Sequence, residues 1–305
     1  MWPCFAVRLR SIASDNAQRS GNPVSRLGCI SEQKPKPSID ARIHHTFIEA
    51  WEARDAGTLE SPTILVALAR TLAWRPWLPQ AERMLDAADL ARVRRRRASR
   101  DREQLTLAYA LHRAMLGAVL GMPPEGVPLY RDAKGCPRLE GGIAATSLSH
   151  TDGAIAIAVT RASTVGIDIE PAERAGVMSE IAGRLCHPRE LHAANATPEP
   201  RRGAAWLALW VRKEALLKAA GTGFEIEPDA FEAPDQTVVE LPGAGGLAVG
   251  MLDAGHGWSA AVAGMPGAAI EYGWTGPHGP LRYQKLGLAA GRPVEAAAGT
   301  SEWKA

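Results

Sequence analysis

The chain has 305 residues, a formal net charge of +2 and 46% hydrophobic residues, which is the profile of a globular protein with enough chain for a substantial core. It contains no stretch of about 18 uncharged apolar residues, which argues against a membrane span. Its four cysteines form no CxxC pair, which argues against a zinc knuckle, a thioredoxin-like motif and a disulfide-rich secreted scaffold.

Composition and hydrophobic periodicity divide the chain into four regions. We predict a poorly ordered N-terminal extension over 1–60, with a composition loosely compatible with a transit peptide, an N-terminal half over 61–164, a C-terminal half over 165–275 and a flexible tail over 276–305. The elements expected inside the two halves, in chain order, are a strand at 63–69, a helix over 86–120, strands at 155–159 and 165–169, a helix over 206–220 that ends at Gly221, and a strand at 258–263.

This order of elements predicts a mixed α/β (α+β) fold. A strand, a long helix and further strands occur twice, which suggests a pseudo-dimer of two similar halves meeting near residue 165. Each half would be a small sheet packed with a long helix. An active site would then lie in the cleft between the halves, a common position for ligand sites.

The segment 165–170 (VGIDIE) is the most informative part of the sequence. On a strand, Ile167 and Ile169 would point into the core, while Asp168 and Glu170 would share the opposite face. Neighbouring carboxylates repel each other unless a cation lies between them, and Mg²⁺ prefers such hard oxygen ligands. The alternative is an edge strand whose acidic face is solvated.

A second segment, 210–218 (WVRKEALLK), places Glu214 and Lys218 on one helical face. A surface ion pair is the simple interpretation. However, only seven of the 35 basic residues are lysines, and two of these seven, Lys213 and Lys218, fall in this segment. A lysine in so arginine-rich a chain suggests that a compact charge is needed, as at a phosphate.

A third segment contains Ser149 and His150, which we expect in a loop or turn before the 155–159 strand. Adjacent residues seldom form a nucleophile and base pair, and no GxSxG elbow is present. A hydroxyl and an imidazole at such a loop could instead bind a phosphate, and a histidine in a simple turn remains the alternative.

The Arg92–Arg102 run could suggest nucleic-acid binding, but no aromatic residue lies between Leu78 and Tyr109, and the chain as a whole is not strongly basic. A Mg²⁺-dependent phosphohydrolase of another class is a second rival, although no P-loop or second acidic cluster supports it.

Together, in this order, Ser149-His150, the GIDIE strand and the WxxKEAxxK helix resemble the 4'-phosphopantetheinyl transferase superfamily, of the Sfp-type. The resemblance runs from about Leu85 to Ala263. It implies a transferase of phosphorus-containing groups, a holo-[acyl-carrier-protein] synthase. Such an enzyme moves the phosphopantetheine arm of coenzyme A onto a serine of an apo acyl or peptidyl carrier protein and releases adenosine 3',5'-bisphosphate. The alternative is a relative that binds coenzyme A or a carrier without turnover.

The resemblance also implies roles for individual residues. Glu214 and Lys218 would be catalytic, and Asp168, Glu170 and Glu214 would hold Mg²⁺. Coenzyme A would be bound by a wider set: Arg95, Arg96, Arg100, Lys134, Gly135, Pro137, Ser149, His150, Asp168 and Lys218. The family's Gly-Lys-Pro turn stands here as Gly135-Cys136-Pro137, with Lys134 displaced to the front, so a side-chain contact from its middle position would be lost.

The expected context is a cytoplasmic monomer of fatty-acid, polyketide or nonribosomal-peptide biosynthesis. Its partners would be coenzyme A and an apo carrier protein, without nucleic acid or membrane.

Overall fold

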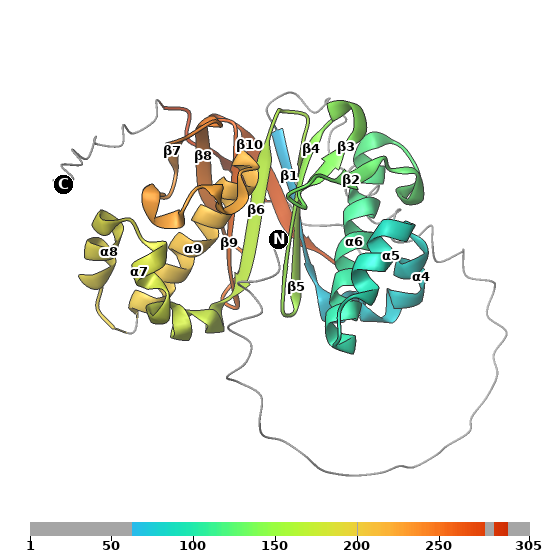
Figure 1. Ribbon diagram of the computed structural model, residues 1–305, viewed down its shortest axis with the longest axis horizontal. Coiled ribbons are helices and arrows are strands. Elements are labelled where there is room, and N and C mark those ends of the chain that lie inside the picture. Colours follow the sequence, from blue (N-terminus) through green and yellow to red (C-terminus); the bar gives the residue numbers. More distant parts are fainter. Residues whose placement is uncertain (1–62, 200, 278–283, 292–305) are drawn as a thin grey trace, which may run out of the picture.

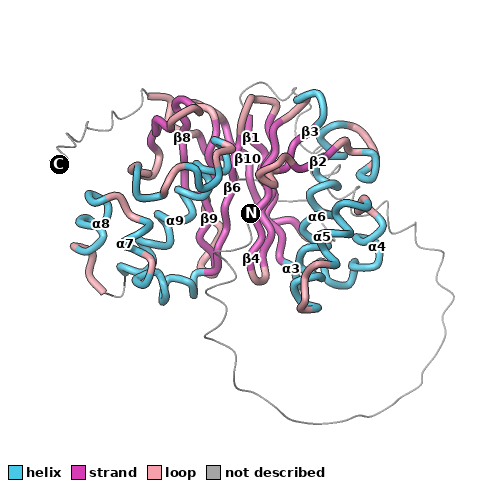
Figure 2. Tube along the Cα trace, viewed as in Figure 1, coloured by secondary structure: helices cyan, strands magenta, loops and turns pink. Residues whose placement is uncertain are grey.

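The computed structural model describes residues 63–199, 201–277 and 284–291. Two sheets form the middle of the molecule, and a helical layer covers the outer face of each (Figure 1). The same order of layers is clear when the chain is coloured by secondary structure (Figure 2). The predicted mixed α/β class is confirmed, whereas the predicted extension over 1–60 lies outside the described residues. Within these ranges, no helix is both long and apolar enough to cross a membrane.

The first sheet has the strand order β11-β10-β1-β5-β4. Strand β1 lies in its middle, pairing in parallel with β10 and antiparallel with β5. The predicted strands at 63–69 and 155–159 are confirmed as β1 and β5. The bounds are β1 Thr63–Arg70, β4 Ala145–Thr151, β5 Ala154–Thr160, β10 Ala269–Thr275 and β11 Gln284–Gly287.

The helices of the first layer are α3 Thr71–Trp74, α4 Leu78–Arg83, α5 Ala87–Arg94 and α6 Ser99–Leu120. The helix predicted over 86–120 is therefore interrupted between α5 and α6. Arg102 stabilises the break, because its Nη1 donates to the carbonyls of Arg96 at 3.1 Å and Arg97 at 2.8 Å, which a continuous helix would use internally. Gly121, at φ 68°, ends α6 in the left-handed conformation.

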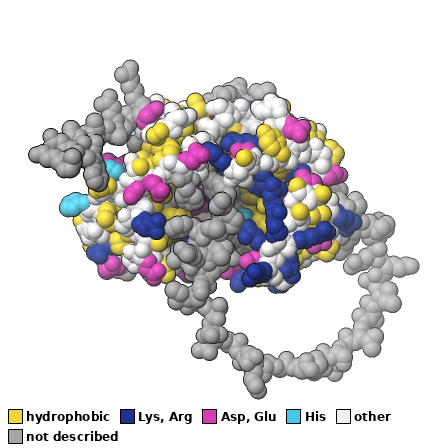
Figure 3. All heavy atoms as spheres, viewed as in Figure 1, with side chains coloured by type: hydrophobic (Ala, Val, Ile, Leu, Met, Phe, Trp, Pro, Cys, Tyr) yellow, Lys and Arg dark blue, Asp and Glu magenta, His cyan; other side chains and the backbone are white. Residues whose placement is uncertain are grey.

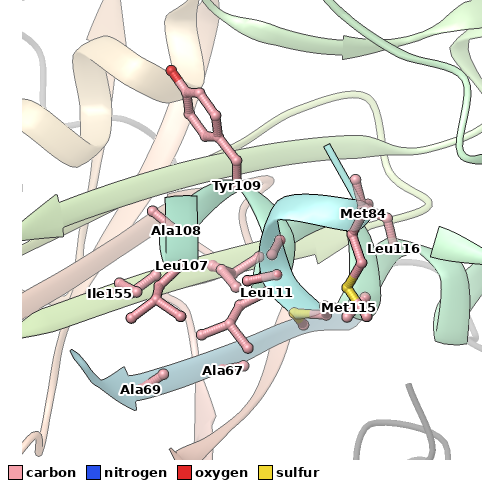
Figure 4. Close-up of a cluster of buried hydrophobic side chains, with 14 of the residues drawn as sticks. Ala67, Ala69, Met84, Leu107, Ala108, Tyr109, Leu111, Met115, Leu116 and Ile155 are labelled. Atoms are coloured by element: carbon pink, nitrogen blue, oxygen red, sulfur yellow. The ribbon is translucent and has the colours of Figure 1, made fainter. Parts of the chain in front are cut away.

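Helix α6 packs its apolar face on the first sheet. Leu107 and Leu111 lie against Ala67 and Ala69 of β1, and Ile155 of β5 completes the contact (Figure 4). The small alanine side chains leave room for the larger leucines, and each fully buried leucine contributes about 1.5–3 kcal/mol.

The second sheet has the order β6-β9-β8-β7, with bounds β6 Val165–Pro171, β7 Thr237–Leu241, β8 Gly245–Leu252 and β9 Trp258–Gly264. Its outer face is covered by α9, Arg201–Ala220. The predicted strands at 165–169 and 258–263 and the predicted helix at 206–220 are confirmed. Gly221, at φ 67°, ends α9 as expected. This layer also contains α7 Ala182–Leu185, α8 Pro188–Asn195 and the 3-10 helices η5 Ala172–Glu180, η6 Gly223–Glu225 and η7 Pro228–Ala230.

A further hydrophobic core joins the inner faces of the two sheets. Ile64 and Leu68 of β1 belong to the same buried cluster as Ile167 and Ile169 of β6 and Val262 of β9. The outward faces of both sheets pack on helices, so both faces of the central strands are buried. Strand β6 lies at the edge of its sheet, but its acidic face is buried and not solvated, so the alternative of a solvated edge strand is wrong.

The C-terminal strands depart from the predicted division of the chain. Strand β10, placed by the prediction in the C-terminal half, pairs with β1 of the first sheet. Strand β11, placed in the tail, pairs with β10, and Leu288 beyond it is buried. The first sheet is therefore built from strands near the beginning and strands near the end of the described residues.

His112 of α6 is fully buried between this helix and the first sheet. Its Nε2 lies 2.7 Å from Thr146 Oγ1, whose own proton goes to the Ala158 carbonyl at 2.9 Å. Nε2 therefore donates, and Nδ1 has no partner among the described residues. Burial first, and then Arg131 and Arg113, lower the pKa of His112 well below 6.5.

We expect His112 to make folding sensitive to mild acid. Below about pH 6.5 the unfolded chain binds a proton that the folded protein excludes, so the free energy of unfolding falls by up to about 1.4 kcal/mol per pH unit. In urea unfolding at pH 7.5 and 5.5, His112→Gln should lose less stability on acidification than wild type. The exposed His192→Gln control should follow wild type, and an identical pH response of His112→Gln would contradict the assignment.

Candidate active site

Strand β6 presents its two acidic side chains to helix α9. Gly166, Asp168 and Glu170 alternate with residues that face the first sheet, and both carboxyl groups are buried. The predicted alternation of Ile167 and Ile169 inward and the two acids outward is confirmed. Because α9 covers the acidic face, these carboxylates must find partners inside the protein.

Strand β4 of the first sheet supplies hydroxyl groups along one side of β6. Ser149 Oγ donates to Asp168 Oδ1 at 2.8 Å, and Thr151 Oγ1 donates to Glu170 Oε2 at 2.9 Å. Ser147 Oγ accepts from the Ile167 backbone N–H at 3.2 Å. The alternating Ser-x-Ser-x-Thr pattern therefore holds the acidic strand at the junction of the two sheets.

Helix α9 brings Glu214 and Lys218 to the same place. They lie one turn apart, and Lys218 Nζ is 2.5 Å from Asp168 Oδ1. A close approach between α9 and β6 makes this contact possible. A Cβ on Gly166 would lie 1.9 Å from the Ala215 carbonyl oxygen, so only glycine fits at that position.

Burial and crowding of charge shift the pKa values of this cluster. Burial, followed by Asp168 and Glu170, raises the pKa of Glu214 to about 7, although Lys218 opposes the shift. Burial and then Asp168 raise the pKa of Glu170. For Lys218, burial lowers the pKa, but the neighbouring carboxylates outweigh it and the net shift is upward.

The chemistry of these donors fits a hard divalent cation. Asp168 Oδ2 is buried and has no hydrogen-bond partner within the described part of the chain, so it is an oxygen available to a ligand. Over the same ranges, no group of three or more His, Cys, Asp or Glu side chains is already arranged to hold a metal ion. Instead, Lys218 pairs with Asp168, and Arg174 Nη1 pairs with Glu170 Oε1 at 2.5 Å.

The structure separates Ser149 from His150. We expected both in a loop and acting together, but they lie on β4, where adjacent side chains point to opposite faces. Ser149 faces Asp168, whereas His150 is on the face that carries Leu148 and Thr146, toward α6. Arg100, predicted as a coenzyme A ligand, ion-pairs at 2.5 Å with Asp152, which lies in the β4–β5 turn two residues after His150.

Arg95 and Arg96 lie at the end of α5, where Arg95 is exposed. The arginine-rich face over α5 and α6 is visible as a group of basic side chains (Figure 3). Nothing in the described contacts brings Arg95 or Arg96 to the acidic cluster.

The turn at Lys134–Pro137 joins two short strands, β2 Leu129–Arg131 and β3 Pro137–Leu139. Gly135 adopts φ 85°, and Asp132 Oδ1 accepts from the backbone N–H groups of Lys134 and Cys136, both at 3.0 Å. Lys134 Nζ reaches the second layer, where it pairs with Glu225 at 2.6 Å. The turn is therefore rigid and lies near the C-terminal end of α9.

Thr151 and Arg174 are site residues that we did not predict from the sequence. The signals were present, because Thr151 continues the alternation of Ser147 and Ser149, and Arg174 stands four residues after Glu170. Neither signal identifies a site residue by itself, because the sequence does not show that β4 lies beside β6 or that η5 turns back toward Glu170.

The other lysine of the motif, Lys213, faces away from the site. Its Nζ contacts Glu190 Oε2 at 2.6 Å, the Pro228 carbonyl at 2.5 Å and the Phe231 carbonyl at 2.6 Å. Glu190 also accepts from the backbone N–H groups of His187 and Ala233. This buried network fixes the outer side of α9 and thereby the direction in which its neighbour, Glu214, points.

Comparison with known proteins points to one family. Residues 164–259 match the model of the 4'-phosphopantetheinyl transferase superfamily, a range that contains β6 and α9. A Synechocystis sp. protein named "Putative 4'-phosphopantetheinyl transferase slr0495" is 26% identical over 153 residues. The match covers 49% of this chain and spans 62% of the relative's length. The matched range contains two of the three motifs, the GIDIE strand and the Lys-Glu helix, and both findings agree with the resemblance to this superfamily.

Gly166→Ala should destabilise the protein by about 1–3 kcal/mol or more, because the added Cβ overlaps the backbone of α9. Gly183→Ala is the matched control, since Gly183 lies in α7 with open space around it. Chemical denaturation of both variants measures the effect, and equal stabilities would refute the close-packing argument.

Lys213→Met should cost about 3–5 kcal/mol, because it leaves the carboxylate of Glu190 buried without its charge partner. Lys285→Met removes an exposed lysine that pairs with Glu271 and should change stability by less than about 1 kcal/mol. The comparison is made from urea midpoints, and a small effect at Lys213 would show that the network does not anchor α9.

Proposed function

Because its residues 164–259 match the 4'-phosphopantetheinyl transferase superfamily, we propose that this chain is a phosphopantetheinyl transferase of the Sfp-type. It would transfer the 4'-phosphopantetheine arm of coenzyme A to a serine of an apo acyl or peptidyl carrier protein. The serine oxygen forms a bond to the phosphorus that bears the arm, the pyrophosphate P–O bond breaks, and adenosine 3',5'-bisphosphate leaves.

The observation that carries this proposal is the buried cluster of Asp168, Glu170, Glu214 and Lys218 at the junction of the two sheets. Carboxylates and a lysine are concentrated where hydroxyl groups of β4 also converge. A pyrophosphate is a polyanion, and its charge must be neutralised before a hydroxyl can attack phosphorus. These are the residue types that such a reaction requires.

Asp168, Glu170 and Glu214 would hold a Mg²⁺ ion, which when bound supplies Lewis-acid stabilisation of the phosphate oxygens. The side chains that now pair with the first two, Lys218 and Arg174, would have to yield part of their contacts. Lys218 would then bind a phosphate oxygen and stabilise its developing charge through the positive ammonium group.

Glu214, directly or through a water molecule, is the candidate for removing the proton of the attacking serine. Without a metal its pKa is raised to about 7, so the carboxyl group can accept a proton near neutral pH, whereas an ordinary glutamate is too weak a base. A bound Mg²⁺ would lower that pKa, so Glu214 would not hold the metal and accept the proton directly at the same moment. General-base assistance of this kind contributes about 10²–10⁴-fold to a rate. The ordered position of α9, fixed by Lys213 on its other side, would keep Glu214 in place.

The nucleotide end of coenzyme A would bind on the first layer. Lys134, Gly135 and Pro137 provide a rigid turn whose glycine allows close approach of a ligand. His150 with Arg100 on the α6 side of β4 is a candidate for the 3'-phosphate, and Ser149 for oxygens nearer Asp168. Arg95 and Arg96 would add a longer-range attraction for anions.

The remaining expectations follow the same proposal. The partners would be coenzyme A and an apo carrier protein, and a monomer would suffice because both sheets come from one chain. A cytoplasmic enzyme that serves fatty-acid, polyketide or nonribosomal-peptide carriers is the proposed context.

The test is an incubation of purified protein with apo carrier protein, coenzyme A and Mg²⁺, read by intact mass spectrometry. Wild type should add one phosphopantetheine group to the carrier, and Asp168→Ala should add none. No gain on any carrier class by folded wild type would indicate a relative that only binds coenzyme A or a carrier. An equal gain with both proteins would leave the transfer standing and remove Asp168 from the metal site.

A further inference from the structure

Two ion pairs neutralise the acidic strand from inside the protein. Asp168 is paired with Lys218, and Glu170 with Arg174, and the side chains of all four residues are at most 19% exposed. Solvent screens charges only weakly in such a position, so each of the four charged groups acts strongly on a nearby cation.

Arg174 is held firmly in this arrangement. It lies in η5, where the Ala172 N–H donates to the Gly257 carbonyl at 2.9 Å. The next residue, Ala175, packs so closely on α9 that a Cβ on Gly203 would lie 2.4 Å from its carbonyl oxygen. The guanidinium group therefore approaches Glu170 from a fixed backbone, unlike an arginine on a mobile surface.

Glu170 is consequently held on both oxygens. Thr151, from the first sheet, donates to Oε2, and Arg174, from the second layer, donates to Oε1. Asp168 differs, because its Oδ1 accepts from Ser149 and Lys218 while its Oδ2 has no hydrogen-bond partner among the described residues. One carboxylate is thus occupied and neutralised, and the other keeps one buried oxygen for a ligand.

The charge balance opposes binding of a divalent cation by itself. Two of the three carboxylates in the cluster, Asp168 and Glu170, are matched by cationic side chains, and only Glu214 has no ion pair of its own among the described contacts. A cation approaching Asp168 is therefore repelled by Lys218 and Arg174 as well as attracted by the acids. Like charges a few ångströms apart interact strongly in a partly buried site. A ligand that carries several negative oxygens, such as a pyrophosphate, would reverse this balance.

We propose that Arg174 is a built-in counter-ion that keeps the affinity of the site for Mg²⁺ alone low, so that the metal binds together with the pyrophosphate of the substrate. This inference rests on the proposed function and deepens it, since it assigns Arg174 as a positioning residue and makes metal and substrate binding mutually dependent. By linkage, each of the two ligands would raise the affinity for the other by the same factor.

Isothermal titration calorimetry with MgCl₂ tests the proposal in the full chain at one pH. For wild type, we expect binding to tighten at least about tenfold when coenzyme A is present, after subtraction of a titration into coenzyme A alone. Adenosine 3',5'-bisphosphate, which lacks the pyrophosphate, should produce a much smaller gain. This comparison does not depend on the folding of any variant.

Arg174→Gln removes the counter-charge and should tighten Mg²⁺ binding to the substrate-free protein by about tenfold. Arg174→Lys keeps the charge and should bind Mg²⁺ as wild type does. The control is Arg161→Gln, at an exposed arginine directly after β5, which should leave the affinity unchanged. The melting temperature of each variant without metal verifies that it is folded, and that of Arg174→Gln should fall because Glu170 loses its partner.

Equal Mg²⁺ affinity of wild type with and without coenzyme A would overturn the proposal, as would unchanged or weaker binding by folded Arg174→Gln. Both outcomes are compatible with transfer by wild type in the mass-spectrometric assay, so they would not overturn the proposed function. A wild-type protein that binds no Mg²⁺ under either condition would overturn the inference and the proposed metal site together, and the two kinds of failure are therefore distinguishable.

Discussion

The closest approach between β6 and α9 sets the geometry of the whole site. At Gly166 the strand touches the helix backbone itself, with no room for even one methyl group. Glu214 is next to Ala215, whose carbonyl makes this contact, and Asp168 is two residues beyond Gly166 on the same face. A backbone contact is stiffer than any side-chain contact, so the separation between the acidic strand and the Lys-Glu helix is fixed by the fold and not by rotamers.

Much of this arrangement could be predicted from local sequence. The alternation of Ile167 and Ile169 with Asp168 and Glu170 fixes which face is acidic, and the spacing of Glu214 and Lys218 fixes a common helical face.

The position of strand β10 in the first sheet could not be predicted, because its pairing with β1 joins segments roughly 200 residues apart and leaves no local signal. The placement of β4 beside β6 joins strands of two different sheets, with Thr151 and Glu170 19 residues apart, and this is why Thr151 escaped prediction. Arg174 is only four residues from Glu170 and escaped because the sequence does not show that η5 turns back toward Glu170. The Ser149-His150 pair was misread for a different reason: the segment was expected to be a loop, where adjacent side chains can converge.

The same residues have to satisfy two requirements that conflict. A chain that buries several carboxylates without counter-charges would fold poorly, since desolvated charge of one sign is costly. Lys218, Arg174 and the hydroxyl groups of β4 meet that requirement. However, groups that stabilise the acids also compete with any cation the acids are meant to bind. The elevated pKa of Glu214 shows the same compromise, because a partly protonated carboxyl group relieves repulsion at the cost of a weaker ligand.

The position of β10 between β1 and β11 has a consequence for synthesis of the protein. Strand β1 leaves the ribosome early, whereas the strand that covers one of its edges follows roughly 200 residues later. During that interval a strongly apolar strand in the middle of the future sheet has an open hydrogen-bonding edge, which is a template for pairing with other chains. A chain that ends before residue 269 would lack β10 and leave this edge of β1 unpaired, so we expect it not to form a smaller working domain.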